Sequence, residues 1–500
     1  MCFTVVVGRQ ATVDGSVLVG HNEENEGPYF VNFRRVHPEQ FAASDLQERR
    51  AAWPRELQQP KYGFLWSQIP GREYSDNYLN EAGVVIVSDG CPSREDDLET
   101  LIDRGEIQQE GIGGLLRRLV AEQAHSAQEA VELIGRLVEE FGYRDSGRTY
   151  VAADAQEAWV VAVVRGRRWL ALRTPDDAAV VIPNVFIFDR IETNALGAPG
   201  DSQSKPALAP PASHRPASPP GKNALPLTPG MRCSADLISY AIQRGWYDPA
   251  SGAPFSFREA YQSAERNLTD PRQWWGQQVL LQEPSVGCAL AVSAKDFVPL
   301  AAPLPWYVRP GRKLSVQDVA ALLRNQQGPR SLFHPATQET AVFQLRAGLP
   351  RPIGCVYWRT VGRPDFSPLL PWYLGVRNVP DEYCHPAFRR QIEIWNPAEP
   401  LAQEIFQPDP SLIWWKFQEL QKTATSAGEQ ALQMVHTVWS ELEQRLWQEQ
   451  PERESTWLSD WPTDPETCSQ RIISYCVAQS EAARKEAECL INRLSGQDGQ

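Results

Sequence analysis

The sequence predicts an α+β fold in which helices stack on antiparallel sheets. Three blocks of the chain lead to this prediction: strand-like apolar runs at the start, helical periodicity over residues 111–141, and a second group of strand-like runs over residues 149–188. Strands and helices therefore occur in blocks, whereas a parallel sheet would alternate them one by one. The connections within the last block have hairpin length, which favours antiparallel pairing.

The chain opens with a predicted β-hairpin. Phe3–Val7 is apolar and rich in β-branched residues, which is typical of a buried strand. Asp14 and Gly15 then supply a turn signal, and Ser16–His21 returns as the second strand. Val84–Val87 is a further short strand of the buried type.

Residues 111–141 predict two consecutive helices. Ser126 followed three residues later by Glu129 is a capping-box pattern, so a second helix begins there. Apolar residues recur at helical spacing on each side of this boundary. They are Leu115, Leu116, Leu119 and Val120 before it, and Ala130, Val131, Ile134, Leu137 and Val138 after it.

The block after Gly142 predicts an antiparallel meander. Its strands are expected at Thr149–Ala153, Trp159–Val164, Trp169–Arg173 and Val180–Phe188. The rest of the chain contributes a helix near Ser234–Arg244, a strand-rich part over Ala341–Thr360, and helical periodicity from Ser411 onward. We expect one large domain over residues 2–400. A proline-rich loop or linker is inserted at 199–222, and a helical segment at 401–495 packs on the same domain.

Composition excludes several classes of protein. The net charge of −13 argues against a nucleic-acid partner, and no apolar run approaches the length of a membrane-spanning helix. The nine cysteines include no C-x-x-C pair and no zinc-finger spacing, so we expect reduced thiols, no metal site and no cofactor. We therefore expect a soluble cytoplasmic protein. It could form a homo-oligomer.

The residue with the clearest chemistry is Cys2. It directly follows Met1, and it is small enough for removal of the initiator methionine to be expected. The mature chain would then carry a thiol and a free α-amine on one residue, with usual pKa values of about 8.5 and about 7.7–8.0. Such an amine can take the thiol proton, so the nucleophile and the base are carried by the same residue. The alternative is that Cys2 is simply an early strand residue.

The residues around Cys2 resemble the dipeptidase A and secernin family of N-terminal-nucleophile hydrolases. The opening strand, the sequence Ala-Thr-Val-Asp-Gly-Ser at residues 11–16, and the polar cluster at residues 20–25 follow that family's order. Further matches follow in the expected order. They are Asn80–Val84, paired helices over Gly113–Gly142, Tyr150–Trp159, Trp169–Asp177, Val181–Asn184, Phe255–Tyr261 and, more thinly, Pro371–Gly375.

The resemblance implies a four-layer αββα sandwich with the mature N-terminus opening into a pocket. It also implies that the substrate is a small peptide or an acyl amide. Cys2 is expected to attack its amide carbonyl while the α-amine moves the proton, and a thioester is expected to form and be hydrolysed. Asn184 is expected to stabilise the oxyanion, because related choloylglycine hydrolases use an asparagine there. The alternative for Asn184 is a polar strand end. Asn22 matches the family pattern, and Asp89 follows a strand that can line the pocket, so both are expected to bind substrate.

Two residues depart from the family pattern. His21 stands where a permanent cation is usual, so it would stabilise a thiolate only when protonated. We therefore expect either activity displaced toward mild acid or a direct substrate contact, unless His21 is an ordinary strand-end histidine. Glu24 stands where aspartate is usual; it would hold the α-ammonium, or it belongs to an exposed acidic loop.

Three functions remain open at this point. The first is a cysteine amidohydrolase, most simply a dipeptidase. The second is an acylase or acyltransferase that acts on non-peptide amides through the same Cys2. The third is a non-catalytic secernin-like protein, which the departures at His21 and Glu24 keep open. Cys91, which follows the Val84–Val87 strand, is interpreted as a buried or edge thiol and not as a second nucleophile.

Overall fold

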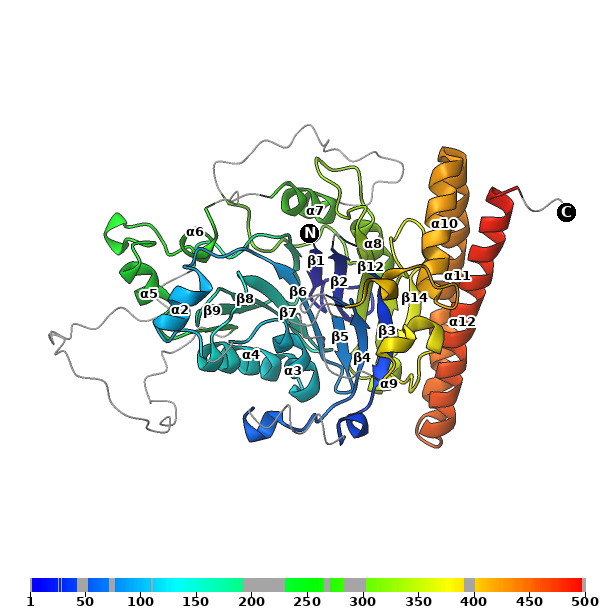
Figure 1. The fold of residues 1–500 in the computed structure, drawn as a ribbon, viewed down its shortest axis with the longest axis horizontal. Coiled ribbons are helices and arrows are strands. Elements are labelled where there is room, and N and C mark those ends of the chain that lie inside the picture. Colours follow the sequence, from blue (N-terminus) through cyan, green and yellow to red (C-terminus); the bar gives the residue numbers. More distant parts are fainter. Residues whose placement is uncertain are drawn as a thin grey trace.

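Two antiparallel sheets form the centre of the molecule, as a computed structural model shows (Figure 1). The structure describes residues 2–25, 27, 29–42, 53–71, 77–108, 111–191, 230–264, 270–282, 303–390 and 401–496. The predicted proline-rich insertion at 199–222 lies outside the described residues. None of the helices within these ranges combines the length and hydrophobicity that crossing a bilayer requires.

The first sheet has six strands and contains the N-terminal hairpin. In spatial order they are β10 (Ala179–Ile182), β1 (Phe3–Val7), β2 (Val17–Glu24), β12 (Thr337–Leu345), β13 (Cys355–Arg359) and β14 (Leu370–Tyr373). The hairpin prediction is confirmed: β1 pairs with β2 so that Phe3 lies opposite Asn22 and Thr4 opposite His21. Successive side chains of β2 point to opposite faces of this sheet, so His21 and Glu23 share one face and Asn22 lies on the other.

The second sheet has eight strands. In spatial order they are β11 (Met231–Cys233), β9 (Trp169–Arg173), β8 (Ala158–Val163), β7 (Arg148–Ala153), β6 (Val85–Gly90), β5 (Asn77–Asn80), β4 (Phe64–Gln68) and β3 (Asn32–Val36). Each strand from β3 to β9 pairs with its neighbour in the chain, so the predicted meander is confirmed and extended.

Helices cover the outer face of each sheet. α3 (Leu115–Gln123) and α4 (Ala127–Phe141) pack on the eight-stranded sheet, whereas α7 (Pro271–Leu281) and α8 (Val316–Leu323) pack on the six-stranded sheet. Apolar side chains from β1 and β6 meet between the sheets, among them Val6, Val85 and Val87. The α+β class and the four αββα layers are therefore confirmed.

Three long helices follow the sheets in the chain. They are α10 (Ile413–Ala427), α11 (Glu429–Asp460) and α12 (Pro465–Leu494). Figure 1 shows them side by side beyond β14, and α12 packs directly on that strand. The shorter helices are α2 (Leu98–Asp103), α5 (Leu237–Gln243), α6 (Phe257–Tyr261) and α9 (Arg351–Gly354). Short 3₁₀ turns lie at Pro38–Ala42, Arg55–Leu57, Pro249–Ser251, Asp381–Tyr383, Pro386–Phe388 and Gln403–Phe406.

Two predictions about elements need correction. The strand expected over Val180–Phe188 ends at Ile182, because Pro183 has no N–H to continue the ladder. It also joins β1 in the other sheet instead of extending the meander. The capping box expected at Ser126 is half formed: its hydroxyl accepts from the Glu129 N–H, but the Glu129 carboxylate accepts from the His125 N–H.

The packing of α4 on β9 yields a test of the helical layer. A Cβ on Gly135 would lie 2.1 Å from Cζ2 of Trp169, whose indole is buried against the helix. Helix propensity alone would favour alanine by about 1 kcal/mol. Because the ring has no room to move, we expect Gly135→Ala to lower the free energy of unfolding by ~1–3 kcal/mol in urea titrations.

The exposed position Glu132 in the same helix provides the control. We expect Glu132→Ala to change the free energy of unfolding by less than about 0.5 kcal/mol. A Gly135→Ala protein that is as stable as the wild type would contradict the close packing of α4 on Trp169.

Candidate active site

A cavity of about 470 Å³ lies where the two sheets meet at the ends of β2 and β6. Its size falls within the range of about 300–1,000 Å³ typical of small-molecule sites. The lining residues are Cys2, Glu23, Glu24, Asn25, Gly90, Cys91, Pro92, Leu98, Arg144, Asp145, Ser146, Gly147, Arg148, Arg165 and Asn184. Cys2, Glu24 and Asn184 are therefore brought together, as the sequence predicts.

Cys2 lies at the wall of this cavity, directly before β1, with 8% of its surface exposed. Its Sγ donates a hydrogen bond to Oε1 of Glu23 at 3.2 Å, and its backbone carbonyl accepts from Nη1 of Arg272 at 3.2 Å. Burial raises the pKa of the Cys2 thiol well above its usual value, and the negative charges of Glu23 and Asp89 raise it further. The surroundings therefore favour the thiol over the thiolate.

A continuous chain of buried hydrogen bonds leads away from the thiol. Oε2 of Glu23 contacts Nε2 of His21 at 3.2 Å, and Nδ1 of His21 contacts Oγ1 of Thr4 at 2.7 Å. The Thr4 hydroxyl donates to Oδ2 of Asp89 at 2.5 Å. Because this hydroxyl has one proton, which it gives to Asp89, Nδ1 of His21 must donate to Thr4.

The charges along this chain follow from its geometry. Burial lowers the pKa of His21, but the hydrogen bond to Glu23 and the charges of Asp89 and Glu23 outweigh burial and raise it above the usual value. Burial raises the pKa of Glu23, yet the hydrogen bond and charge of His21 bring it to about 2. Burial raises the pKa of Asp89 to about 6. His21 and Glu23 thus form a buried ion pair beside Cys2.

Asn184 lies in the loop after β10 and lines the cavity. Its Nδ2 donates to the carbonyl of Gly90 at 3.0 Å, and its Oδ1 accepts from Nη2 of Arg272 at 2.9 Å. Arg272 therefore fixes which end of the amide faces the cavity, because an arginine can only donate. The same guanidinium holds the carbonyl of Cys2, so one buried side chain positions both residues.

The three other predicted site residues occupy different surroundings. Glu24 lines the cavity and is only 5% exposed, so it does not belong to an exposed acidic loop; its Oε1 accepts from the Thr337 hydroxyl at 3.0 Å. Asn22 points to the opposite face of the sheet, where Nδ2 donates to the carbonyls of Leu323 and Leu332, so it joins β2 to α8 and does not line the cavity. Asp89 is fully buried behind His21 and also does not line the cavity.

Sequence reasoning missed Glu23, Thr4 and Arg272. Glu23 follows from the hairpin register: because Phe3 lies opposite Asn22, the next pair outward is Cys2 and Glu23. Arg272 belongs to α7, and no motif around it signals a site. The interpretation of Cys91 as a buried thiol is confirmed, since it is fully buried and burial raises its pKa to about 12.

The side chains that offer metal ligands also lie here. Cys2, His21 and Glu23 each present one ligand atom, and these atoms lie within 4.8 Å of one another. The spacing of cysteines and histidines in the sequence predicts no metal site. The hairpin register and the alternation along β2 create this group from residues that no sequence motif connects.

The cavity has walls of different charge. Glu23 and Glu24 at the end of β2 form the acidic wall, which belongs to the six-stranded sheet. The opposite wall comes from the loops around β7 and β8 of the other sheet, and it contains Arg144, Arg148 and Arg165 together with one carboxylate, Asp145.

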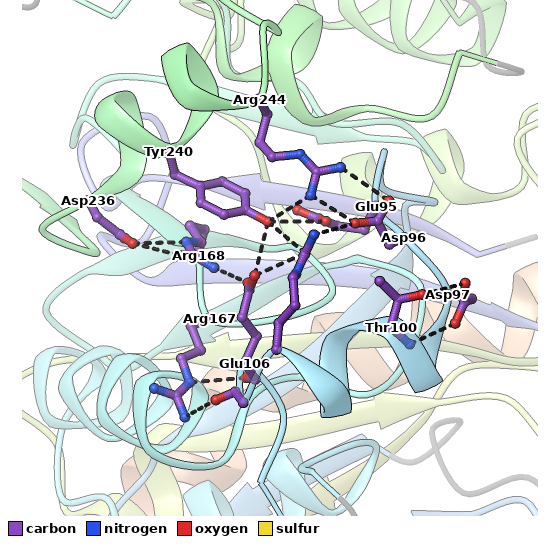
Figure 2. Close-up of polar contacts among 12 residues, drawn as sticks. Glu95, Asp96, Asp97, Thr100, Glu106, Arg167, Arg168, Asp236, Tyr240 and Arg244 are labelled. Carbon is purple, nitrogen blue, oxygen red and sulfur yellow. Dashed lines mark hydrogen bonds and ion pairs between the residues drawn. The ribbon is translucent and has the colours of Figure 1, made fainter. Parts of the chain in front are cut away.

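A polar network fastens the cavity wall formed by residues 91–108. Figure 2 shows the Tyr240 hydroxyl at its centre, within hydrogen-bond distance of Oε2 of Glu95 and Oε1 of Glu106, each at 3.4 Å. Asp96 accepts from Arg104 and Arg244, and its backbone carbonyl accepts from Arg165 at 3.3 Å. This segment, which supplies Pro92 and Leu98 to the cavity, is therefore held by charged groups on both sides.

Glu95 is a carboxyl group of this network that is destabilised when it ionises. Burial and the charge of Glu106 raise its pKa, against the effect of Arg244, to about 7, and its Oε1 is buried with no hydrogen-bond partner among the described residues. The folded state therefore holds this proton more tightly than the unfolded chain. The free energy of unfolding therefore falls as pH rises from about 4.5 through 7, because Glu95 loses its proton. Above about pH 7 the loss of stability is complete.

We expect Glu95→Gln to raise the free energy of unfolding by about 2 kcal/mol at about pH 8.5 and to have little effect at about pH 4.5. Urea titrations at both pH values measure this difference. Glu99→Gln, at an exposed site in α2, should change the free energy of unfolding by less than about 0.5 kcal/mol at either pH. An equal gain for Glu95→Gln at both pH values would contradict this explanation.

Comparisons with known proteins agree with this site. The model of peptidase family C69 matches residues 1–203 and 227–393. The chain is 26% identical over 402 residues to a probable dipeptidase of Salmonella dublin, covering 75% of this chain and 82% of that protein. It is 25% identical over 411 residues to a probable dipeptidase A of Streptococcus pyogenes serotype M1, covering 77% of each.

A more distant relative is dipeptidase A of Lactobacillus helveticus, 22% identical over 436 residues, with coverage of 79% of this chain and 80% of that protein. Among solved structures, the C2A mutant of a conjugated bile acid hydrolase from Clostridium perfringens aligns with 72% of this chain and 89% of that one. The identity is 10% and the TM-score 0.27. The family match covers well over half of the sequence, so the chain belongs to peptidase family C69 and is a cysteine peptidase.

Proposed function

We propose that the protein is a dipeptidase whose nucleophile is the thiol of Cys2, exposed at the head of the chain by removal of Met1. The observation that carries this proposal is the position of Cys2 at the wall of the cavity, beside Asn184 and Glu24. Relatives that match three quarters of the chain are named dipeptidases, which supports the substrate class.

The protonation of the site favours the α-amine as the base. Glu23 accepts the thiol hydrogen bond, but with a pKa of about 2 it is too weak to take the proton. The α-amine of a processed Cys2 has a usual pKa of about 7.7–8.0 and lies on the same residue. It would take the proton as sulfur attacks the peptide carbonyl and give it to the departing amine. Water then releases the acyl group from the thioester.

Asn184 is the proposed oxyanion donor. Its side-chain oxygen accepts a hydrogen bond from Arg272, and one of its two N–H groups donates to the carbonyl of Gly90. The second N–H has no acceptor among the described residues, and Asn184 lines the cavity. A donor fixed before the reaction stabilises the developing negative charge without reorganising in the transition state.

The basic wall supports recognition of the free carboxylate of a dipeptide. Arg165 donates only to backbone carbonyls, those of Asp145 and Asp96, and neither Arg144 nor Arg165 forms an ion pair within the described residues. Among the described residues, two of the three guanidinium groups on this wall therefore have no ion-pair partner. A carboxylate is the group that arginine binds best, through two parallel N–H bonds.

The acidic wall lies on the side of Cys2. Glu24 would hold the α-ammonium of the processed Cys2, as the resemblance implies, or face the ammonium of the substrate. A zwitterionic dipeptide matches a cavity with opposite charges on opposite walls. His21 is a cation here because Glu23 and Asp89 raise its pKa, so it supplies the charge that an arginine would supply. This weakens the case for a non-catalytic protein.

A cytoplasmic location belongs to the same proposal. Every described cysteine is a free thiol, which fits a reducing compartment. The proposal includes no nucleic-acid partner and no membrane, and it allows a homo-oligomer that light scattering on the purified protein would detect.

The first test concerns Met1 and Cys2. We expect the intact mass of the purified protein to lack Met1, and Cys2→Ala to lower kcat for a dipeptide by about 10³-fold or more, because the nucleophile is lost. Cys91→Ala removes the other cysteine at the cavity and should keep most of the activity. Turnover of a non-peptide acyl amide but of no dipeptide would favour the acylase alternative. A complete lack of turnover would favour the non-catalytic one, and full activity of Cys2→Ala would reject Cys2.

The second test concerns the basic wall. We expect Arg165→Gln and Arg144→Gln to lower kcat/KM for a free dipeptide by about 10–100-fold, because a charged hydrogen bond is worth about 1.5–3 kcal/mol. The corresponding dipeptide amide, which has no carboxylate, should be affected little by either variant. Arg167→Gln is the matched control, because Arg167 lies in the same turn and donates to the carbonyls of Gly105 and Glu106. Equal losses for dipeptide and amide would contradict carboxylate recognition.

A further inference from the structure

Three side chains of the active site offer atoms that can bind a metal ion, which hydrolysis does not require. Cys2, His21 and Glu23 present a sulfur, an imidazole nitrogen and a carboxylate oxygen within 4.8 Å of one another, and all three residues are buried. Within the described residues no other group of this kind is found. We propose that these three residues form a Zn²⁺ site and that the bound metal inhibits the peptidase.

The spacing of the ligand atoms suits a tetrahedral ion. Sγ of Cys2 lies 3.2 Å from Oε1 of Glu23, and Nε2 of His21 lies 3.2 Å from Oε2 of Glu23. Zinc bonds of about 2.0–2.3 Å give edges of about 3.3–3.8 Å between the ligand atoms of a tetrahedron. The two ligand atoms that lie farthest apart are within 4.8 Å of each other. To reach a tetrahedral edge they would approach by about 1 Å, which side-chain rotation allows.

The surroundings of His21 are those of a metal-binding histidine. Nδ1 donates to the Thr4 hydroxyl, and that hydroxyl donates to Asp89. This fixes the ring and leaves Nε2, the nitrogen that faces Cys2 and Glu23, as the one able to bind a metal. A carboxylate that orients a ligand histidine from behind is a regular feature of zinc sites.

Metal binding would displace protons from the ligand atoms. When Zn²⁺ enters, any proton on Sγ and on Nε2 leaves to solvent, so that a thiolate, a neutral imidazole and a carboxylate surround the ion. Together these ligands carry two negative charges, which balance the two positive charges of Zn²⁺ in the buried site.

The consequence for activity follows from the sulfur. Three protein ligands leave one position of the tetrahedron open, and Cys2 and Glu23 both line the cavity, so water or a substrate group would complete it there. Coordination to zinc engages a lone pair of the sulfur, lowers its nucleophilicity and holds it away from the carbonyl that it would attack. The inhibition rests on the proposed function, whereas the site itself rests only on the three side chains.

The test uses the purified full-length protein and Zn²⁺ alone. Competition with a chromophoric chelator should give one ion per chain, and Co²⁺ in its place should show thiolate-to-metal charge-transfer absorption. His21→Arg keeps the positive charge beside Glu23 but offers no ligand atom, so affinity should fall by about 100-fold or more. Dipeptidase activity of the wild type should be lost on adding Zn²⁺ and restored by EDTA.

Three further variants keep the test decisive if His21→Arg fails to fold. Thr4→Val removes the hydroxyl behind His21 and should weaken Zn²⁺ binding by about 10–100-fold. Cys91→Ala, which removes the buried cavity thiol outside the group, should leave both the affinity and the Co²⁺ spectrum unchanged. Unaltered binding in Cys2→Ser, or no binding in the wild type, would overturn the site. Binding without loss of activity would overturn only the inhibition. An inactive wild type that still binds Zn²⁺ would count against the proposed function alone.

Discussion

The active site depends on the buried ion pair between His21 and Glu23. Both side chains project from β2 between the two sheets, and the pair joins Cys2 on one side to Thr4 and Asp89 on the other. Because Asp89 belongs to β6, this chain of contacts also connects the six-stranded sheet to the eight-stranded sheet. Loss of one partner would leave a buried charge without compensation, which typically costs about 3–5 kcal/mol. Catalysis and the packing of the sheets thus share one set of contacts.

The same pair decides how the proton of Cys2 is handled. Glu23 is committed to His21, which lowers its pKa to about 2, so it can orient the thiol but cannot take its proton. The negative charges of Glu23 and Asp89 disfavour a resting thiolate. A neutral thiol that loses its proton only during attack fits a base carried on the same residue better than a permanently ionised cysteine would.

Local patterns predicted the strands, the paired helices and the place of Cys2, because each depends on neighbouring residues alone. The hairpin register was not predictable in this way, since the nine residues 8–16 between β1 and β2 exceed any turn whose length determines the pairing. Glu23 was missed for that reason, and Asn22, which was expected to bind substrate, instead donates to the carbonyl of Leu323 on the face toward α8. Arg272, which positions Cys2 and Asn184, comes from a helix about 270 residues away in sequence, and only tertiary packing brings it to the site.

His21 connects the proposed hydrolysis with the proposed metal site. An arginine at this position would provide a positive charge at every pH and nothing more. A histidine provides the same charge only while both ring nitrogens hold protons, and Thr4 keeps just one of these protons in place. The proton on Nε2 faces Glu23 and Cys2, so a metal ion that replaces this proton would also bind the sulfur of Cys2. A single ring nitrogen therefore determines whether the thiol remains available to substrate or is held by a metal ion.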